Sequence, residues 1–597
     1  MHLRIQGSAA LASIAVLGAA TLADAATTGP EALPKQPVAY GTGGGVATMS
    51  PYASAAAIDV LRHGGNAVDA AVAAAATLGV SEPFVAGPGG GGYFVYYRAS
   101  DHKVFTIDGR EKAPAGAAPE MFLGPDGKPI NFEQAVESGV SIGVPGQVAT
   151  WGVALSRFGT RPLASVLKPA SRVARRGFRL DPALVKSISD NRAKLGHFAA
   201  SAKQYLPEGN VPAVGALQRN AALAATYDQI GRHGWRWFYT GPIASEIANA
   251  VQSPVVSAGT PAVAGGTMTA EDLGAYTAVL RSPVTWTYHG YRIYGMAPSS
   301  SGGTTVGEAM KILGNFDPSG DRTEALFRYL EASKLAFADR GQFLGDPAFV
   351  SVPVKGLLSA GFGQQRAGLI GASALSAPVA PGDPMPFNGG AAARRAYTGD
   401  SADHEQHTNH LVVADSKGNV VSYTNTIEQI AGSGITVANR GFLLNNELTD
   451  FNFPTGTANS VQPGKRPRSS MSPTIVTRHG RVVEAIGSPG GSTIITTVLQ
   501  MLLNQIDFGM SLPAAIEAPR ASQRNAAKTD AEPAFINTYG AALQAKGESF
   551  NPMEYIGIAA GLSLLGNGHV QTATESWRGG GGSAMVVRPV NPDPLSR

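Results

Sequence analysis

The feature that most restricts the fold is an abrupt change of composition close to residue 408. Residues 373–403 are rich in Pro, Gly, Ala and Ser and have no periodicity, which predicts an exposed, flexible segment. The text that follows at residues 410–426, HLVVADSKGNVVSYTNT, holds two β-rich runs and predicts a hairpin with its turn near Gly418-Asn419. The chain therefore leads an irregular segment directly into a strand of the core.

Helices and an aromatic strand are predicted upstream. Residues 51–80 indicate two Ala-rich helices that break at Gly64-Gly65, and Asn66 with Asp69 three positions on is a suitable cap for the second helix. The text GPGGGGYFVYY, residues 87–97, passes from glycines straight into an aromatic strand. Because no Lys-Ser/Thr follows these glycines, close backbone packing is favoured over a phosphate-binding turn.

Helical periodicity returns twice further along the chain. Apolar residues at three- and four-residue spacing predict packing helices within residues 162–278. A second glycine turn after Pro298 leads into another helix, and EALFRYLEASKLAFADRGQFL predicts an amphipathic one. These segments are most simply interpreted as structural.

Size and charge set the class of protein. The chain has 597 residues, of which 44% are hydrophobic and 15% charged, as expected for one very large domain or two to three ordinary ones. A net charge of +4 with no long Lys/Arg run argues against a nucleic-acid partner. The absence of cysteine from the sequence excludes disulfides, thiolate metal sites and a cysteine nucleophile.

The first 25 residues have the pattern of a secretory signal. Arg4 precedes an Ala/Leu/Val run that ends in Ala23-Asp24-Ala25, and cleavage is expected after Ala25. A buried N-terminal helix is the alternative. No other segment has enough uninterrupted apolar residues to span a membrane, so we expect an exported protein, periplasmic or secreted, with no membrane span.

Three histidines at the junction raise the question of a metal site. His404, His407 and His410 recur every three residues, where the loop passes into the strand. A zinc site needs histidines on one face of a helix or of a strand pair, together with a carboxylate or water position. This spacing provides neither pattern, so a solvated polar junction is favoured and no metal is predicted.

Thr408 offers a third interpretation of the junction. If the bond between His407 and Thr408 were cut, Thr408 would carry a hydroxyl nucleophile and a free α-amino group that can act as its base. Downstream, GSPGGSTIITTVLQ is a glycine turn that opens a helix, and the N–H groups of Gly490 and Gly491 could form an oxyanion hole there. Further candidate polar groups are Glu447, Asp450, Ser469 and Ser470.

Several motifs, in the same order, resemble the γ-glutamyltranspeptidases, also called glutathione hydrolases. The small subunit of that family is similar to the text around Thr408, LLNNELTDF, KRPRSSMSPTIV and GSPGGSTIITTVLQMLLNQIDFGMSLPAAIEAPR. Its large subunit is similar to GGNAVDAAVAAAATLGVSEPFVAGPGGGGYF, IDGREKAP, SGVSIGVPG and SSSGGTTVGEAMKIL. The resemblance covers roughly Tyr40 to Arg520.

The resemblance implies an α/β fold, the four-layer αββα sandwich of the N-terminal-nucleophile hydrolases, with two subunits made from one precursor. Residues 26–407 would form the large subunit, with 373–407 as a flexible segment before the cleavage site, and residues 408–597 the small catalytic subunit. Thr408 would attack the carbonyl of His407 to cut the chain, and the two subunits would stay associated.

The resemblance also implies catalytic roles. Thr408 would then attack a γ-glutamyl amide and pass the acyl group to water or to an acceptor amino acid or peptide. Thr426, matching the family's second threonine, would orient Thr408, while the backbone of Gly490 and Gly491 would bind the oxyanion. No cofactor is implied.

Substrate-binding roles follow in the same way. Arg110, Ser469 and Ser470 would hold the α-carboxylate of the γ-glutamyl group, because arginine can bind it bidentately. Glu447 and Asp450 would bind the α-ammonium.

Three departures from the family pattern qualify this assignment. Glu428 stands where the family usually has Asn, so three carboxylates surround one expected ammonium, and such crowding should raise a pKa or require an extra cation. Only a short segment follows Asp450 before Lys465, which predicts a site without a lid and open to bulkier substrates. TESWRGGGG replaces the usual Asp-Pro-Arg near the C-terminus, and Asn409 follows Thr408 where many members have Thr.

The predicted activity is that of a self-processing γ-glutamyltransferase or glutathione hydrolase. On the same fold, the alternative is an acylase that removes a glutaryl-type side chain, as the family's cephalosporin acylases do. From another class, a non-catalytic exported binding protein or a His-bound metal protein stays open.

Overall fold

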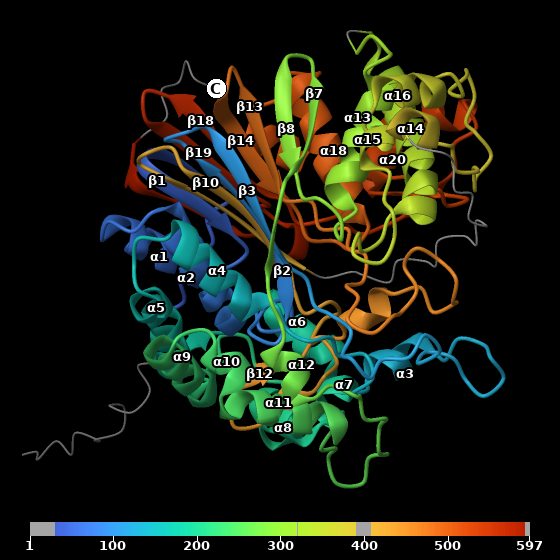
Figure 1. Ribbon diagram of the computed structural model, residues 1–597. Helices are drawn as coiled ribbons and strands as arrows, with labels where there is room; N and C mark the ends of the chain where they lie inside the picture. Colours follow the sequence, from blue (N-terminus) through green and yellow to red (C-terminus); the bar gives the residue numbers. More distant parts are fainter. Residues whose placement is uncertain (1–29, 319, 390–407, 591–597) are drawn as a thin grey trace, which may run out of the picture.

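The computed structural model describes residues 30–318, 320–389 and 408–590, and a single large sheet organises them (Figure 1). Within these residues, a 13-stranded antiparallel sheet runs β6-β3-β2-β10-β9-β1-β19-β18-β14-β13-β8-β7, and β20 pairs with β1. Its strands are β1 (Val38–Thr48), β2 (Gly91–Arg98), β3 (Lys103–Gly109), β6 (Val279–Arg281), β7 (Val284–Tyr288), β8 (Tyr291–Gly295), β9 (Asn409–Asp415), β10 (Val420–Thr426), β13 (Thr474–Arg478), β14 (Arg481–Gly487), β18 (Ala560–Gly566), β19 (His569–Thr574) and β20 (Ser583–Pro589).

The sheet curls so that its two halves stack face to face. One buried apolar cluster contains only strand and strand-end residues of both halves, among them Val95 of β2, Val412 of β9 and Ile475 of β13. The period of two along β2 explains the layering, because Phe94 and Tyr96 point to the opposite side and join a cluster with helices.

Helices cover both outer faces. The first face carries α1 (Pro51–Arg62), α2 (Ala67–Ser81), α4 (Gln147–Phe158), α5 (Leu163–Arg176) and α9 (Ala221–His233). The second face carries α13 (Gly302–Leu313), α14 (Arg322–Phe343), α18 (Thr493–Ile506), α19 (Leu512–Glu517) and α20 (Pro533–Ala545). The layers are therefore helix, sheet, sheet, helix, and the predicted αββα sandwich is confirmed.

The two Ala-rich helices form as predicted. The Asn66 side chain accepts hydrogen bonds from the N–H groups of Val68 and Asp69, 3.0 Å each, and the Asp69 side chain accepts the Asn66 N–H. Small side chains let α2, which is buried along its whole length, lie close to the sheet.

Short elements complete the described chain. A helical lobe beneath the sandwich contains β4 (Phe178–Arg179), α6 (Pro182–Asp190), α7 (Arg192–His197), α8 (Ala199–Tyr205), η1 (Pro207–Gly209), β5 (Leu217–Gln218), α10 (Trp237–Thr240), α11 (Pro242–Gln252), α12 (Ala270–Gly274), β11 (Thr436–Val437) and β12 (Phe442–Leu443). Elsewhere lie α3 (Phe132–Val136), α15 (Val354–Leu357), α16 (Ala360–Ala367), α17 (Met385–Asn388), η2 (Glu447–Asp450), β15 (Ala521–Ser522), β16 (Thr529–Ala531), β17 (Phe550–Pro552) and η3 (Arg578–Gly580).

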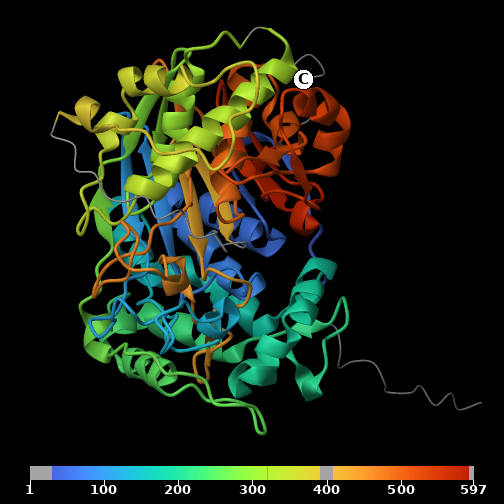
Figure 2. The same cartoon turned by 90° about the vertical axis from the view of Figure 1, so that its right-hand side faces the viewer.

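The N-terminal segment joins the lobe to the C-terminal part of the chain. In Figure 2 the C-terminal elements, in red, stand above the lobe helices, in teal, on the right-hand side. Lys35 pairs with Asp181 of the lobe at 2.8 Å and donates to the carbonyl of Gly580 at 3.0 Å. Residues from distant parts of the sequence are thereby tied together.

The predicted hairpin lies at the centre of the sheet. β9 and β10 pair antiparallel from Ala414–Val420 to Asn409–Asn425, and Gly418 has φ +81° at the turn. β1 and β2 flank the hairpin, so both of its strands are fully buried.

The irregular segment before the hairpin is partly described. Residues 373–389 include the short helix α17, and the N–H groups of Ala374 and Val379 donate to Lys546 O and Asn525 Oδ1, both at 2.7 Å. These contacts tether this part of the segment to the C-terminal half of the chain. Residues 390–407, and the expected signal at 1–25, lie outside the described residues.

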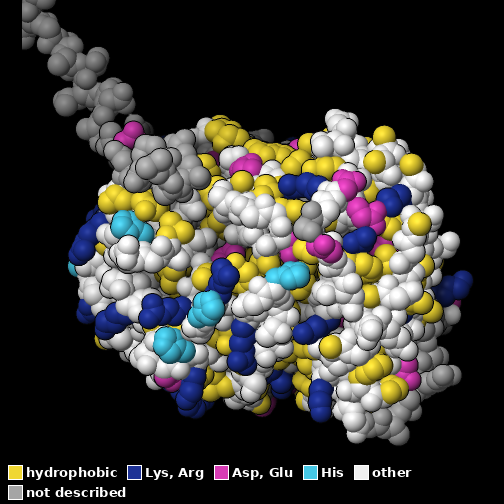
Figure 3. All heavy atoms as spheres, turned by 90° about the horizontal axis from the view of Figure 1, so that it is seen from above, with side chains coloured by type: hydrophobic (Ala, Val, Ile, Leu, Met, Phe, Trp, Pro, Cys, Tyr) yellow, Lys and Arg dark blue, Asp and Glu magenta, His cyan; other side chains and the backbone are white. Residues whose placement is uncertain are grey.

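The surface is mixed in charge. On the face seen in Figure 3, Lys and Arg side chains are spread among acidic and neutral groups. Among the described helices, none combines the length and the apolar character that a membrane crossing requires.

Candidate active site

The hairpin brings the two predicted threonines to the same end of the central sheet. Thr408 immediately precedes β9 and is 3% exposed, and Thr426 is the last residue of β10. The neighbouring register pair is Asn409–Asn425. Their proximity follows from antiparallel pairing, because the start of one strand meets the end of the other.

A glycine turn faces the same space as Thr408. Gly490 and Gly491 have φ of +132° and +57°, and they lie in the turn between β14 and α18. Their carbonyls accept the N–H groups of Thr493 and Ile494, whereas among the described residues no backbone hydrogen bond uses their own N–H groups. Thr408 and Gly490 both line a pocket of about 400 Å³, so the N–H groups beside that pocket can serve as oxyanion donors.

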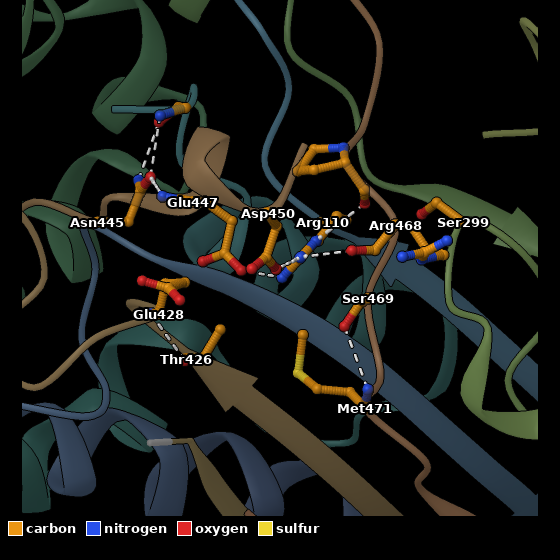
Figure 4. Close-up of polar contacts among 12 residues, drawn as sticks. Arg110, Ser299, Thr426, Glu428, Asn445, Glu447, Asp450, Arg468, Ser469 and Met471 are labelled. Carbon is orange, nitrogen blue, oxygen red and sulfur yellow. Dashed lines mark hydrogen bonds and ion pairs between the residues drawn. The ribbon is translucent and has the colours of Figure 1, made fainter. Parts of the chain in front are cut away.

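A buried ion cluster collects three of the predicted substrate-binding residues (Figure 4). Arg110 follows β3 and forms ion pairs with Glu447 and Asp450 of η2, and both Arg110 and Glu447 are fully buried. The guanidinium also donates to the carbonyls of Pro467, at 3.3 Å, and Arg468, at 3.2 Å. Within the described residues, Glu447 Oε2 has no hydrogen-bond partner. The cation and two acids expected at opposite ends of a glutamyl group are therefore in direct contact.

Glu428 reaches the same region from the end of β10. Its N–H donates to Thr426 Oγ1 at 2.8 Å, and its carboxylate accepts from the side chains of Asn446 and, at 3.1 Å, Gln429. Its φ of +78° is rare for a residue with a side chain. Glu428 thus connects the second threonine to the segment that carries Glu447.

The two serines are buried nearby but their hydroxyls already have partners. Ser470 Oγ accepts from Arg340 Nη2 at 2.8 Å, and Ser469 Oγ accepts from the N–H of Met471 at 3.2 Å. Arg110 therefore binds backbone carbonyls next to these serines and not their hydroxyls. The hydroxyl of Ser470 binds the guanidinium of Arg340, a residue that sequence reasoning missed. The only sequence signal for Arg340 is a charged pair, Asp339-Arg340, that ends an otherwise apolar stretch of α14.

Sequence comparison decides the family of this site. Residues 53–585 match the γ-glutamyltranspeptidase family. The chain belongs to that family. Glutathione hydrolase proenzyme from Bacillus subtilis (strain 168) is 41% identical over 486 residues, which cover 81% of each chain. The protein of the same name from Escherichia coli (strain K12) is 35% identical over 585 residues, covering 93% of this chain and 96% of its own.

A solved structure extends the comparison to the fold. Cephalosporin acylase from Bacillus halodurans superposes with a TM-score of 0.80 at 27% identity, covering 94% of this chain and 99% of its own. Transpeptidase-family and acylase sequences therefore share this sandwich, and the side chains at the site have to distinguish their activities.

Of the three junction histidines, only His410 is described. It lies on β9 with Nδ1 2.8 Å from Thr424 Oγ1, and burial lowers the pKa of its ring to about 3. Gly487 leaves room for the ring, because a Cβ there would lie 2.2 Å from it. His410 is a neutral core residue behind Thr408, and the part of the chain that the structure describes holds no group of metal-binding side chains.

The segment after Asp450 packs on an apolar group and stays bonded to the backbone of the cluster, because the Asn459 side chain donates to Asp450 O at 2.6 Å and accepts the N–H of Arg468 at 2.8 Å. Phe453 stacks on Phe122 with 4.4 Å between ring centroids, and Phe451 joins the same apolar group. This packing directs the segment toward the loop around residue 122.

Sequence reasoning also missed the far wall of the Thr408 pocket. Arg524, Asp530 and Tyr555 line it, and they come from stretches without a motif. A larger cavity of about 800 Å³ lies between the helical lobe and Lys35, and Thr408 is not among its lining residues. The chemistry of the site therefore belongs to the smaller pocket.

Proposed function

We propose that this member of the γ-glutamyltranspeptidase family is a self-processing γ-glutamyltransferase and glutathione hydrolase. The observation that carries the proposal is the position of Thr408, at the start of the central strand and facing the same pocket as Gly490. The glutathione hydrolase proenzymes that cover most of this chain support it.

Self-processing converts one precursor into two subunits, residues 26–407 and 408–597. Thr408 Oγ attacks the carbonyl carbon of His407, the peptide C–N bond breaks, and the nitrogen becomes the α-amino group of Thr408. Water then opens the resulting ester. The pairing of β9 with β1 and of β10 with β2 crosses between the two subunits and keeps them associated after the cut.

Catalysis uses the new N-terminus. The α-amine of Thr408 takes the proton of Oγ as this oxygen attacks the γ-carbonyl of the substrate, and the amine leaving group departs with that proton. The N–H groups of Gly490 and Gly491 bind the oxyanion, while Thr426 fixes the position of Thr408. Water or an acceptor amine then releases the γ-glutamyl group.

The buried cluster supplies the recognition of the glutamyl end. The α-carboxylate of the substrate pairs with Arg110 in place of Glu447 and Asp450. These two carboxylates then bind the α-ammonium of the substrate. Ser469 and Ser470 line the carboxylate side, and Glu428 adds a further acceptor for the ammonium. A zwitterion satisfies all of these charges in a region where an unpaired ion is strongly disfavoured.

The acylase alternative is supported by the cephalosporin acylase fold relative. A glutaryl group has no ammonium, so its carboxylate would compete with Glu447 and Asp450 for Arg110 and would bring no cation for these acids or for Glu428. Turnover of γ-glutamyl against glutaryl anilides separates the two activities. Equal or faster glutaryl turnover would make the acylase assignment the better one.

Export is a separate part of the proposal. It rests on the signal-like residues 1–25, and it predicts a mature chain in the periplasm or medium that begins after Ala25.

Denaturing electrophoresis with N-terminal sequencing tests the nucleophile. We expect two bands, the smaller one beginning at Thr408, and Thr408→Ala should remain a single chain with activity reduced by at least about 10⁴-fold. Thr408→Ser should retain some processing. Thr538→Ala, on the exposed face of α20, is the matched control and should process normally. If Thr408→Ala still splits at the same bond, another group is the nucleophile.

A further inference from the structure

A groove on the first helical face concentrates positive charge. Helices α5 and α9 lie side by side there (Figure 1), and the space between them has a volume of about 610 Å³. Neither Thr408 nor Arg110 is among its lining residues, so the groove is separate from the candidate active site. Its charged lining residues are Lys168, Arg172, Arg175 and Arg176 of α5 and Asp228 and Arg232 of α9.

The sequence places the basic residues of α5 on one side of that helix. They recur at spacings of four, three and one residues, and residues three or four apart share a helical face. The opposite side, which includes Val166, Ala170 and Ala174, is buried in the core. At about 1.5 Å per residue, Lys168 to Arg176 covers about 12 Å along the helix axis. Core packing therefore fixes these basic residues toward the groove.

Most of this positive charge has no acidic partner. Asp228 is the one acid among the residues that line the groove. Its Oδ1 accepts the hydroxyl of Ser171 at 2.6 Å, and its other carboxylate oxygen pairs with Arg175. Among the described residues, four side chains of the groove have neither a hydrogen bond nor an ion pair, and we call them the unpaired cations: Lys168, Arg172, Arg176 and Arg232.

Buried side chains form the floor of the groove. Leu167 and Ser171 of α5 and Tyr227 of α9 line it and are no more than 2% exposed. The two helices pack closely, because a Cβ on Gly231 would lie 3.0 Å from the Cα of Ala164. The backbone positions that carry the unpaired cations are therefore held at a fixed spacing.

Stabilisation of the helices explains only part of this charge. Arg176 and Arg232 stand in the last turns of α5 and α9, where a cation complements the helix dipole. Lys168 and Arg172 lie in earlier turns of α5, and two like charges four residues apart destabilise a helix. An anion bound between Lys168 and Arg172 would remove this repulsion.

The charge and size of the groove select the ligand. A phosphate monoester carries a charge of about −1.5 to −2 at pH 7, so two neighbouring phosphates balance the unpaired cations. A single carboxylate would leave most of them unbalanced. Arginine also binds phosphate oxygens bidentately, and the volume of the groove lies in the range of small-molecule sites.

We propose that the groove between α5 and α9 binds a small ligand with two or more neighbouring phosphate groups, held by the unpaired cations. The ligand is a soluble phosphorylated molecule or the headgroup of a phospholipid, because both present the same groups to the groove. Binding there is separate from the chemistry at Thr408, so it adds a second ligand to the proposed function.

Calorimetric titration with sodium tripolyphosphate tests the site. The purified protein should bind this anion saturably at physiological ionic strength, and added salt should weaken the binding because the cations are exposed. Lys168→Gln combined with Arg172→Gln should weaken the affinity about a hundredfold, since two charge-assisted contacts are lost. Lys168→Arg combined with Arg172→Lys retains both charges and should stay within about tenfold of the wild type.

A matched pair of arginines outside the groove separates site binding from net charge. Arg478 and Arg481 are exposed and pair across the turn between β13 and β14. Arg478→Gln combined with Arg481→Gln removes the same charge and should leave the affinity for tripolyphosphate unchanged. Circular dichroism spectra and melting curves report that each variant is folded.

Sedimentation with vesicles of phosphatidylcholine and cardiolipin identifies the source of the phosphate groups. Cardiolipin carries two phosphates in one headgroup, so a lipid ligand predicts co-sedimentation that tripolyphosphate displaces and that Lys168→Gln/Arg172→Gln abolishes. Tripolyphosphate binding without co-sedimentation identifies a soluble ligand. Both results support the proposal.

Three outcomes overturn the proposal. The first is a wild type with no saturable binding of tripolyphosphate at physiological ionic strength. The second is undiminished binding by Lys168→Gln/Arg172→Gln, which would place the anion elsewhere. The third is an equal loss of affinity in Arg478→Gln/Arg481→Gln, which would reveal an effect of net charge alone.

Discussion

The two sides of Thr408 are built in opposite ways. On the glutamyl side, Arg110 and Glu447 are fully buried and bound to each other. On the pocket side, the side chain of Arg524 is 25% exposed and lies at the wall of the pocket that Thr408 also lines. A buried cluster tolerates only a ligand that replaces every charge it displaces, whereas a partly solvated wall tolerates variation. A ligand at the buried cluster should therefore be selected more strictly than a ligand in the pocket.

Removing Arg110, the buried cation, should have the largest effect on the difference between the two sides. Arg110→Met leaves Glu447 and Asp450 without the guanidinium that neutralises them, and we expect a loss of about 3–5 kcal/mol in unfolding free energy. We also expect kcat/KM for γ-glutamyl-p-nitroanilide to fall about a thousandfold. Denaturant titration and steady-state kinetics measure the two effects.

The control for Arg110 is an exposed arginine. Arg175→Met removes the exposed pair with Asp228 and should change the unfolding free energy by no more than about 1 kcal/mol. A loss of less than tenfold in kcat/KM for Arg110→Met would show that the cluster does not bind substrate.

The proposed oxyanion donors of the glycine turn would act in both hydrolysis and transfer, so substitution of the turn should affect both reactions equally. Gly490→Ala places a Cβ 2.6 Å from Thr493 Oγ1 at a φ of +132°, which forces the turn to move. We expect kcat to fall about 10²- to 10³-fold for hydrolysis and transfer alike. Gly480→Ala, also at positive φ but facing open space, should lower stability and leave kcat unchanged. Equal kcat values for the two variants would rule out the oxyanion role.

Glu428 tests whether the third carboxylate contributes to recognition of the γ-glutamyl donor. Glu428→Gln keeps the shape of the side chain but removes one charge next to the expected ammonium. The ratio of γ-glutamyl to glutaryl turnover should fall about tenfold, since a charge-assisted hydrogen bond is lost for one donor only. An unaltered ratio would place Glu428 outside donor recognition.

A buried carboxylate remote from both regions tests the smallest effect. Burial raises the pKa of Glu484 from 4.5 to about 8, against the hydrogen bond donated by Gln505. Because the folded pKa is raised, the protonated form stabilises the fold below pH 4.5, and this contribution is lost as the pH rises through 8. Glu484→Gln should therefore gain about 1–2 kcal/mol over the wild type across this range. Melting curves at several pH values would reveal it, and parallel curves for the two proteins would refute it.

Local structure could be predicted from short stretches of sequence. The capping box at Asn66, the helix break at Gly64-Gly65 and the hairpin turn at Gly418 depend on neighbours within a few residues. The αββα layering followed from the family resemblance, and the alternation of Val95 with Phe94 shows the physical pattern behind it.

The candidate site could be predicted only in part. Motifs identified Arg110, Glu447 and Asp450, which the fold brings together, but not that the arginine is paired with both acids. The partner of Ser470 was missed because Arg340 is distant in sequence. Nor did any motif point to Arg524, whose relevance depends on contact with the turn after Gly491.

By itself, the sequence determined the family, the order of the elements and the threonine at the start of the central strand, because these depend on local periodicity, turn chemistry and extended motifs. The tertiary structure decided which charges meet and which remain available. Ion pairing and burial arise from residues hundreds of positions apart, such as Arg110 and Glu447, and only the curled sheet brings them within contact. The division of the site into a buried, charge-paired cluster and a partly exposed pocket is therefore a property of the fold.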